Sequence, residues 1–132
     1  EHSLMQQHSR ATELLNVLKR QGVRLVLDDF GTGYSNLMTL SSMPFDMLKI
    51  DRTFVAGMDN GAPGHALVGM ITSLADQLQL KVVAEGVETE AQQAMVAALG
   101  CDIVQGYLHA PPLPGASFEE LALARDSAGA AA

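Results

Sequence analysis

Four short apolar runs that each end in polar residues constrain the fold of this chain more than any other feature of its sequence. Buried parallel strands read as continuous apolar runs, and the residues just past their carboxyl ends carry the chemistry of a barrel. The pattern therefore predicts a metal or phosphate site at the mouth of a barrel. The runs with their polar ends are Leu25-Val26-Leu27 with Asp28-Asp29, Met47-Leu48 with Lys49 and Asp51, Val82-Val83-Ala84 with Glu85, and Ile103-Val104 with Gln105.

The segments between these runs have the apolar spacing of amphipathic helices. Helices are predicted at 3–20, 35–42, 66–78, 89–99 and 118–124, and strands at 23–27, 45–50, 81–84 and 102–105. This order leaves room for right-handed crossovers between parallel strands. Because 132 residues are too few for a barrel of about 250, the sequence predicts half of one. An open doubly wound sheet is the alternative, but Gly31-Thr32-Gly33 lacks the third glycine of its phosphate-binding loop.

Charge and cysteine content narrow the possible partners. The net charge is -7, with 15 acidic and 8 basic residues, which argues against binding of polymeric nucleic acid through its backbone. Cys101 is the only cysteine and cannot form an internal disulfide, so a reducing compartment and a buried, unreactive thiol are favoured. No apolar stretch approaches the roughly 20 residues that span a bilayer. We expect a cytoplasmic segment without membrane contact, in a parent protein that other domains can still anchor to a membrane.

Asp28 and Asp29 are the most informative polar pair. Adjacent carboxylates repel each other unless a cation or a base neutralises them. Neighbouring residues of an extended strand point to opposite sides, so this pair can hold two different metal ions. Oxygen ligands suit Mg, Mn or Ca, and two such ions would clamp the attacking and leaving oxygens of a phosphodiester displacement. A turn-forming pair of aspartates is the alternative.

The other polar strand ends each have a functional and a structural interpretation. Lys49 ends an apolar strand and should meet a carboxylate, a phosphate or a metal-bound water, with Asp51 as the nearest structural partner. Glu85 is a candidate metal ligand or base for water, and Glu88 a brace for a neighbouring loop; alternatively, both cap the next helix. Gln105 can align a water or a ligand, or can be satisfied by backbone groups.

Four ordered strings closely resemble the EAL domain family. They are Asp28-Asp29-Phe30-Gly31-Thr32-Gly33-Tyr34-Ser35, Lys49-Ile50-Asp51-Arg52, Val83-Ala84-Glu85-Gly86-Val87-Glu88-Thr89 and Gln105-Gly106-Tyr107-Leu108. Members of that family are bacterial phosphodiesterases that use Mg or Mn to open cyclic di-GMP to linear pGpG on a modified eight-stranded barrel. The resemblance implies an α/β fold, namely the C-terminal half, about four βα units, of a modified TIM-type (β/α)8 barrel. It makes residues 1–125 a partial EAL domain and 126–132 a disordered tail.

The resemblance also assigns roles to individual residues. Asp28, Asp29 and Glu85 would bind a two-metal centre of Mg or Mn that is incomplete in this chain. Glu85 would also help to activate the attacking water. Lys49 would contact the region of the metal-bound water, and Gln105 would hold that water or the substrate.

A second group of residues is implied to support substrate and loop geometry. The loop that contains Gly31, Thr32 and Gly33 would reshape the site when substrate binds and would contribute to a homodimer. Glu88 would be a supporting residue, and Glu1 would brace the loop.

Departures from the family pattern leave two functions open. The glutamate of the family's name, an asparagine ligand and a further glutamate ligand belong to strands outside this chain. We therefore expect the intact parent to be a cyclic di-GMP phosphodiesterase and the 132 residues alone to be inactive. The alternative is a non-catalytic EAL-like receptor for cyclic di-GMP or a protein-interaction module. An unrelated metal-dependent barrel enzyme, such as an aldolase, accounts for the acids at the strand ends but not for the strings around them.

Overall fold

The core of the molecule is a sheet of four parallel strands in sequential order. The computed structural model describes residues 2–31 and 37–129, so the expectations for Glu1, Thr32 and Gly33 lie outside the described residues. The sheet has the order β1-β2-β3-β4, and all three pairings are parallel. The strands are β1 (Val26–Phe30), β2 (Met47–Ile50), β3 (Lys81–Glu85) and β4 (Ile103–Gln105). An order without reversal is that of a barrel segment and excludes the doubly wound alternative.

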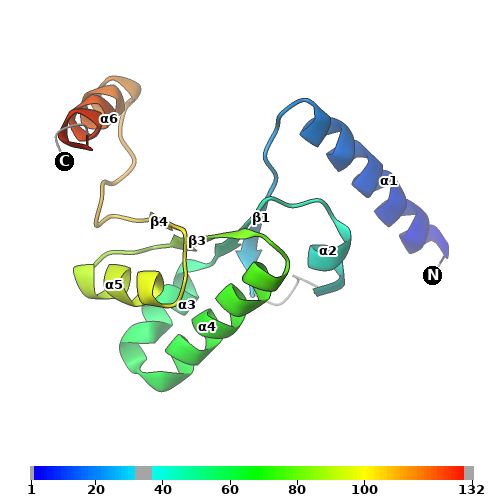
Figure 1. Ribbon diagram of the computed structural model, residues 1–132, viewed down its shortest axis with the longest axis horizontal. Helices are drawn as coiled ribbons and strands as arrows, with labels where there is room; N and C mark the ends of the chain where they lie inside the picture. The colour runs from blue at the N-terminus through cyan, green and yellow to red at the C-terminus, as the bar shows by residue number, and fades with distance from the viewer. Residues whose placement is uncertain (1, 32–36, 130–132) are drawn as a thin grey trace.

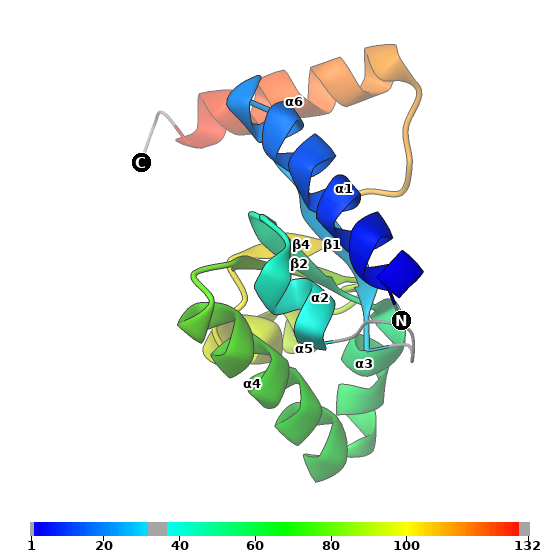
Figure 2. The ribbon, with the colours of Figure 1, turned by 90° about the vertical axis from the view of Figure 1, so that its right-hand side faces the viewer.

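Helices connect the strands and cover one side of the sheet. They are α1 (His2–Arg20), α2 (Leu37–Ser42), α3 (Arg52–Gly57), the 3₁₀ helix η1 (Met58–Asn60), α4 (Ala62–Gln77), α5 (Glu90–Ala98) and α6 (Gly115–Gly129). Figures 1 and 2 show α3, α4 and α5 together on one side of the sheet, whereas α1 and α6 stand away from it. Within the described residues, no helix is long and apolar enough to cross a membrane.

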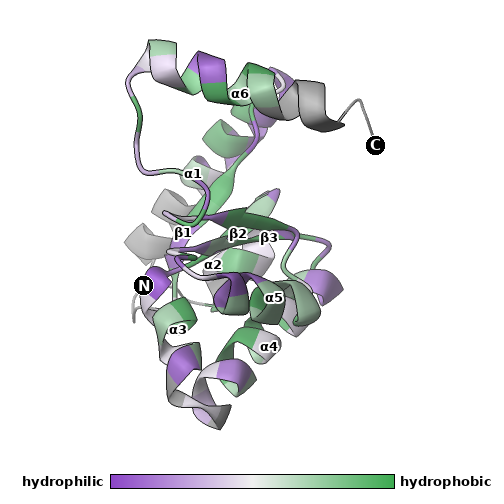
Figure 3. Cartoon of the chain, turned by 90° about the vertical axis from the view of Figure 1, so that its left-hand side faces the viewer, coloured by the Kyte–Doolittle hydropathy of each residue, from purple (hydrophilic) through white to green (hydrophobic). Residues whose placement is uncertain are grey.

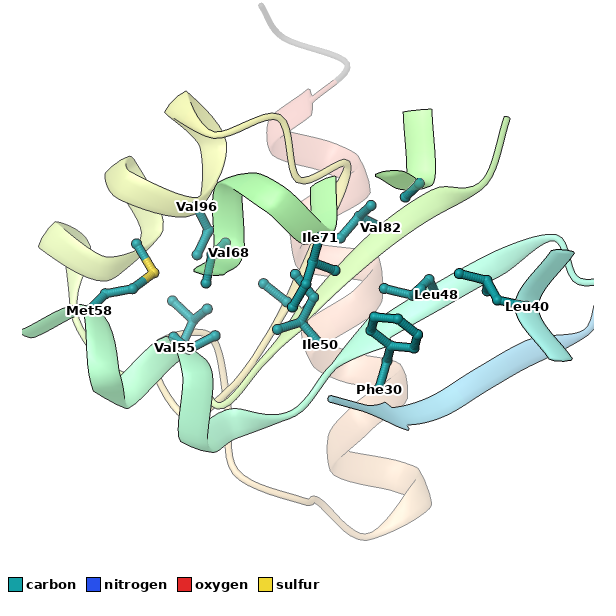
Figure 4. Close-up of a cluster of buried hydrophobic side chains, with 13 residues drawn as sticks. Phe30, Leu40, Leu48, Ile50, Val55, Met58, Val68, Ile71, Val82 and Val96 are labelled. Atoms are coloured by element: carbon teal, nitrogen blue, oxygen red, sulfur yellow. The ribbon is translucent and has the colours of Figure 1, made fainter. Parts of the chain in front are cut away.

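The hydrophobic core lies between the sheet and these helices. In β2, Leu48 and Ile50 are fully buried and pack with Val55 of α3 and Val68 of α4 in one cluster, as Figure 4 shows. Figure 3 shows the strands as a mainly apolar layer beside helices of mixed character. Because side chains alternate along a strand, Lys49 between these two residues faces the other side of the sheet.

That other side of the sheet is open and carries both apolar and polar side chains. Ile103 and Val83 share it with Lys49, since the three are partners in the parallel register. Val26 pairs with Met47 and lies on the same side. The exposed fractions of Val26 and Ile103 are 45% and 40%. The side of the sheet that would face the interior of a closed barrel is thus partly uncovered.

Several element boundaries differ from those predicted. β1 begins at Val26, not at residue 23, and includes both aspartates, because Phe30 at its end is buried and pairs with Ile50. The helix predicted at 118–124 extends over Gly115–Gly129, so the disordered tail predicted from residue 126 is wrong for 126–129. Alanine-rich sequence favours helix there, and 130–132 lie outside the described residues.

The stretch after β2 contains two helical elements that the sequence interpretation missed. Asp51 is the N-cap of α3, and its carboxylate accepts a hydrogen bond from the Thr53 N–H at 2.8 Å. Pro63 lies in the first turn of α4, where its missing N–H has no helical partner to lose. An aspartate directly before a helix-compatible run was the available signal.

Cys101 packs against the core, as an inert thiol would. It is half-buried beside the main cluster. Burial, followed by the charge of Asp102, raises the pKa of Cys101 to about 11. The thiolate, which is the reactive form, is therefore scarce at neutral pH.

We expect Asp46→Asn to destabilise the chain in a pH-dependent way. Asp46 Oδ1 lies 2.8 Å from Lys19 Nζ and its Oδ2 accepts from the Leu25 N–H at 2.8 Å. The hydrogen bond from Lys19, followed by that from Leu25, lowers the pKa of Asp46 in the folded state. Its stabilising effect is therefore complete above the ordinary carboxyl pKa and is lost as the pH falls through the folded pKa.

Urea unfolding at pH 7 and at pH 3 measures this effect. The variant should lose about 1 kcal/mol at pH 7, the contribution of a typical intramolecular hydrogen bond, and less than that at pH 3. Asp76→Asn, at an exposed position of α4, is the control. An equal loss at both pH values would show that the carboxylate charge is not what stabilises this contact.

Candidate metal centre

Three carboxylates converge at the C-terminal ends of the strands. One oxygen each of Asp28, Asp29 and Glu85 lies within 4.8 Å of the others. The two aspartates are exposed at the end of β1, and Glu85 is half-buried at the end of β3. β2 lies between these strands, so residues far apart in the sequence meet because their strands are near neighbours.

A break in the regular structure of β1 brings both aspartates into this cluster. In a regular strand, adjacent side chains point to opposite faces. Here the register between β1 and β2 shifts between Leu27 and Phe30, and Asp29 has a φ of 52°. Aspartate is one of the few residues that tolerates this left-handed conformation. The expectation that the pair faces opposite sides is wrong, because the irregularity directs both carboxylates toward one centre.

Lys49 lies between the acids. Its Nζ is 3.2 Å from Glu85 Oε2 and 3.5 Å from Asp28 Oδ1. Burial works to lower the pKa of Lys49, but the hydrogen bond to Glu85 and the charges of Asp28 and Glu85 outweigh it, so the pKa is raised. The proposed local partner, Asp51, instead caps α3. Lys49 is therefore positively charged at neutral pH within the cluster.

The donor set fits a hard divalent cation. Three carboxylates and one ammonium leave an excess of negative charge at the described cluster, and all candidate ligand atoms are oxygens. Ca takes oxygen ligands at roughly 2.3 to 2.6 Å, so two oxygens on one Ca ion can be up to about 5 Å apart, whereas Mg, at about 2.0 to 2.1 Å, limits them to about 4 Å. The spacing of up to 4.8 Å fits Ca as it stands, and a smaller ion such as Mg requires the carboxylates to move closer together.

Glu85 and Gln105 lie next to each other, because they are register partners at the ends of β3 and β4. A cleft of about 300 Å³ is lined by both residues, by Glu88 and by Arg52 and Tyr107. The alternative in which the glutamates cap α5 does not hold, because the N-cap is Thr89, whose side chain accepts from the Gln92 N–H at 3.1 Å.

Two glycines bring neighbouring segments into close contact with the site. A Cβ on Gly86, where φ is +75°, would lie 2.5 Å from Cβ of Arg52. A Cβ on Gly31, where φ is +101°, would lie 2.5 Å from the ring of Phe54. Arg52 and Phe54 both belong to α3, so this helix supports the loops after β1 and β3. The sequence interpretation gave neither residue a role, because it predicted no helix in their segment.

Fold and site together define a partial α/β barrel with a candidate divalent-metal centre at the carboxyl ends of its strands. The sequence pattern of the EAL domain matches residues 1–112. This chain belongs to the EAL domain family.

Characterised and solved relatives support this assignment. Cyclic di-GMP phosphodiesterase NbdA of Pseudomonas aeruginosa is 44% identical over 120 residues, which cover 91% of this chain and 15% of NbdA. The structure of the PaMucR phosphodiesterase in complex with c-di-GMP matches with a TM-score of 0.77 at 43% identity, covering 83% of this chain and 44% of that one. Klebsiella pneumoniae BlrP1, solved with manganese and cyclic di-GMP, matches with a TM-score of 0.68 at 33% identity, covering 76% and 26%.

These matches confirm the predicted fold class. The solved relatives are EAL domains of the TIM-barrel type, and the four parallel strands with alternating helices form part of such a barrel. The chain spans less than half the length of each of these relatives.

Proposed function

We propose that the parent domain of this chain is a metal-dependent phosphodiesterase that hydrolyses cyclic di-GMP to linear pGpG. The observation that carries the proposal is the convergence of Asp28, Asp29 and Glu85 around Lys49 at the strand ends. The similarity to NbdA, a protein named as a cyclic di-GMP phosphodiesterase, supports the substrate. The alternative is a non-catalytic receptor for cyclic di-GMP.

In the proposed reaction the three carboxylates hold Mg or Mn together with ligands from the rest of the barrel. BlrP1 has been solved with manganese and with calcium, which supports a divalent ion of this kind. Such ions, when bound, polarise a phosphoryl oxygen and lower the pKa of water. The second ion of the proposed centre needs ligands beyond these three residues.

The residues of the chain itself would act by orientation and charge. Glu85 would accept a hydrogen bond from the attacking water and help to withdraw its proton. Lys49 would keep Glu85 and Asp28 in place and stabilise negative charge that develops on the phosphate. Gln105, on the same cleft as Glu85, would donate its amide to the water or to a phosphate oxygen. Glu88 and Gly31 would support the loops that frame the site.

We also propose that the 132 residues alone are inactive and that the chain forms a homodimer in the cytoplasm. The partly exposed Val26 and Ile103 on the open side of the sheet support dimerisation, because apolar surface favours burial. The further metal ligands that the family resemblance implies belong to strands outside this chain, which supports the proposed lack of phosphodiesterase activity in the 132 residues alone.

Calorimetric titration with Mn²⁺ and cyclic di-GMP tests the proposal, with linear pGpG assayed and molar mass measured on the same samples. The parent domain should bind both and form linear pGpG. The chain alone should bind Mn²⁺ weakly, form no product and have twice the mass of a monomer. If the parent domain binds cyclic di-GMP but forms no linear pGpG, it is a receptor and not a phosphodiesterase.

A further inference from the structure

Gln92, a buried glutamine in the first turn of α5, makes more contacts than a helix cap requires. Its exposed fraction is 5%. In a capping box, the side chain of the third helical residue accepts only from the N-cap N–H. Gln92 Oε1 accepts from the N–H groups of both Thr89, at 3.2 Å, and Glu88, at 2.8 Å. Its Nε2 donates to Asp59 Oδ2 at 2.7 Å.

The backbone that Gln92 holds is the loop that follows Glu85. In this loop Val87 is fully buried. Its N–H donates to the Gln105 carbonyl at 3.1 Å, and its carbonyl accepts from the Leu108 N–H at 3.1 Å. One side of the loop is therefore bonded to the exit of β4 and the other side to Gln92.

Close packing restricts movement of the loop. A Cβ on Gly106 would overlap with the Val87 carbonyl oxygen, and a Cβ on Gly86 would lie 2.5 Å from Cβ of Arg52. The backbone is thus in contact with α3 on one side and with the β4 exit on the other. A shift of the segment that Gln92 holds must be transmitted to Glu85, which directly precedes Gly86.

Asp59 anchors the other end of this contact in a different part of the fold. It lies in η1, between α3 and α4. α3 carries Arg52, which lines the cleft beside Glu85. The Gln92–Asp59 hydrogen bond therefore links the loop after β3 to the helical unit that supports it.

We propose that Gln92 and Asp59 form a tether that sets the position of Glu85 and Gln105 for metal and substrate. Both are positioning residues, since they act through the loop backbone. The role of the tether in metal binding rests on the proposed function, whereas its effect on the loop does not. The two parts of the proposal can therefore be tested separately.

Gln92→Glu is the informative variant. A glutamate keeps an acceptor for both N–H groups and serves a capping box as well as glutamine does. It lacks the amide donor, however, and places a second carboxylate against Asp59. We expect Mn²⁺ affinity, measured by calorimetry on the chain, to fall about tenfold, the lower end of the loss found for direct outer partners of a metal ligand, because Gln92 acts on Glu85 only through the loop. Amide hydrogen exchange at Val87 and Leu108 should become faster.

Adding D59N to Q92E supplies an amide donor opposite the new carboxylate and should restore most of the affinity and the slow exchange. Gln93→Glu makes the same charge change at the next position of α5 and should leave the Mn²⁺ affinity and the exchange rates unchanged.

Wild-type Mn²⁺ affinity and wild-type exchange rates in Q92E would overturn the proposal. The proposal would also be overturned if the double variant melted at the wild-type temperature but kept the Mn²⁺ affinity and the exchange rates of Q92E. If wild type binds no Mn²⁺, the proposed metal site fails, and unchanged exchange in Q92E then overturns the tether.

Discussion

Glu85→Gln is expected to lower the Mn²⁺ affinity of the chain and the hydrolysis rate of the parent domain by more than about 100-fold. Loss of an outer partner of a metal ligand costs 10- to 100-fold, and Glu85 is proposed to touch the ion itself. The substitution also removes the negative charge 3.2 Å from Lys49 Nζ. The surplus negative charge that favours a divalent cation is thereby reduced. Calorimetry with Mn²⁺ and an assay of linear pGpG measure the two effects.

Glu90→Gln is the matched control, since Glu90 is an exposed residue in the first turn of α5. The control should bind Mn²⁺ like wild type. Wild-type Mn²⁺ affinity in the Glu85→Gln variant would show that Glu85 is not a ligand of the proposed metal centre. Loss of hydrolysis without loss of affinity would instead assign it to activation of water alone.

Leu48→Ala is expected to lower the free energy of unfolding by about 2 to 5 kcal/mol, the usual cost of truncating a fully buried leucine. Leu48 has no exposed surface and lies in β2, where it pairs with Leu27 on one side and Val82 on the other. Domains of this size are stable by roughly 5 to 15 kcal/mol, so the variant should lose a large fraction of its stability. Urea unfolding followed by circular dichroism measures the change.

Leu14→Ala provides the comparison on α1, where the leucine is 61% exposed. Exposed substitutions of this kind usually change stability by less than about 0.5 kcal/mol. Equal losses in the two variants would show that the cluster around Leu48 is not the core that holds the sheet together.

The strand ends could be predicted from the sequence because their signal is local. An apolar run followed at once by an acid or a lysine identifies a strand exit without knowledge of the rest of the fold. Glu85 and Lys49 were found in this way. The cap of α5 at Thr89 is equally local, because the glutamine of its capping box lies only three residues away.

Contacts between distant segments could not be predicted in the same way. Asp51 was as good a local partner for Lys49 as any residue, and only the sheet order brings Asp28 and Glu85 to its two sides. Nothing in two successive aspartates reveals the left-handed backbone of Asp29. The contact between Gln92 and Asp59 joins two helical elements, one of which was not predicted.

The sequential order of the strands also affects how the site can form during folding. Asp28, Lys49 and Glu85 lie on β1, β2 and β3, and each strand pairs with the one before it in the chain. Each ion pair of Lys49, with Asp28 and with Glu85, therefore needs only one crossover to close, and the approach of the two aspartates to Glu85 needs two. Contacts of short sequence separation have a low entropic cost of loop closure and tend to form early. The charged cluster can thus assemble from three consecutive strands before any barrel closes around it.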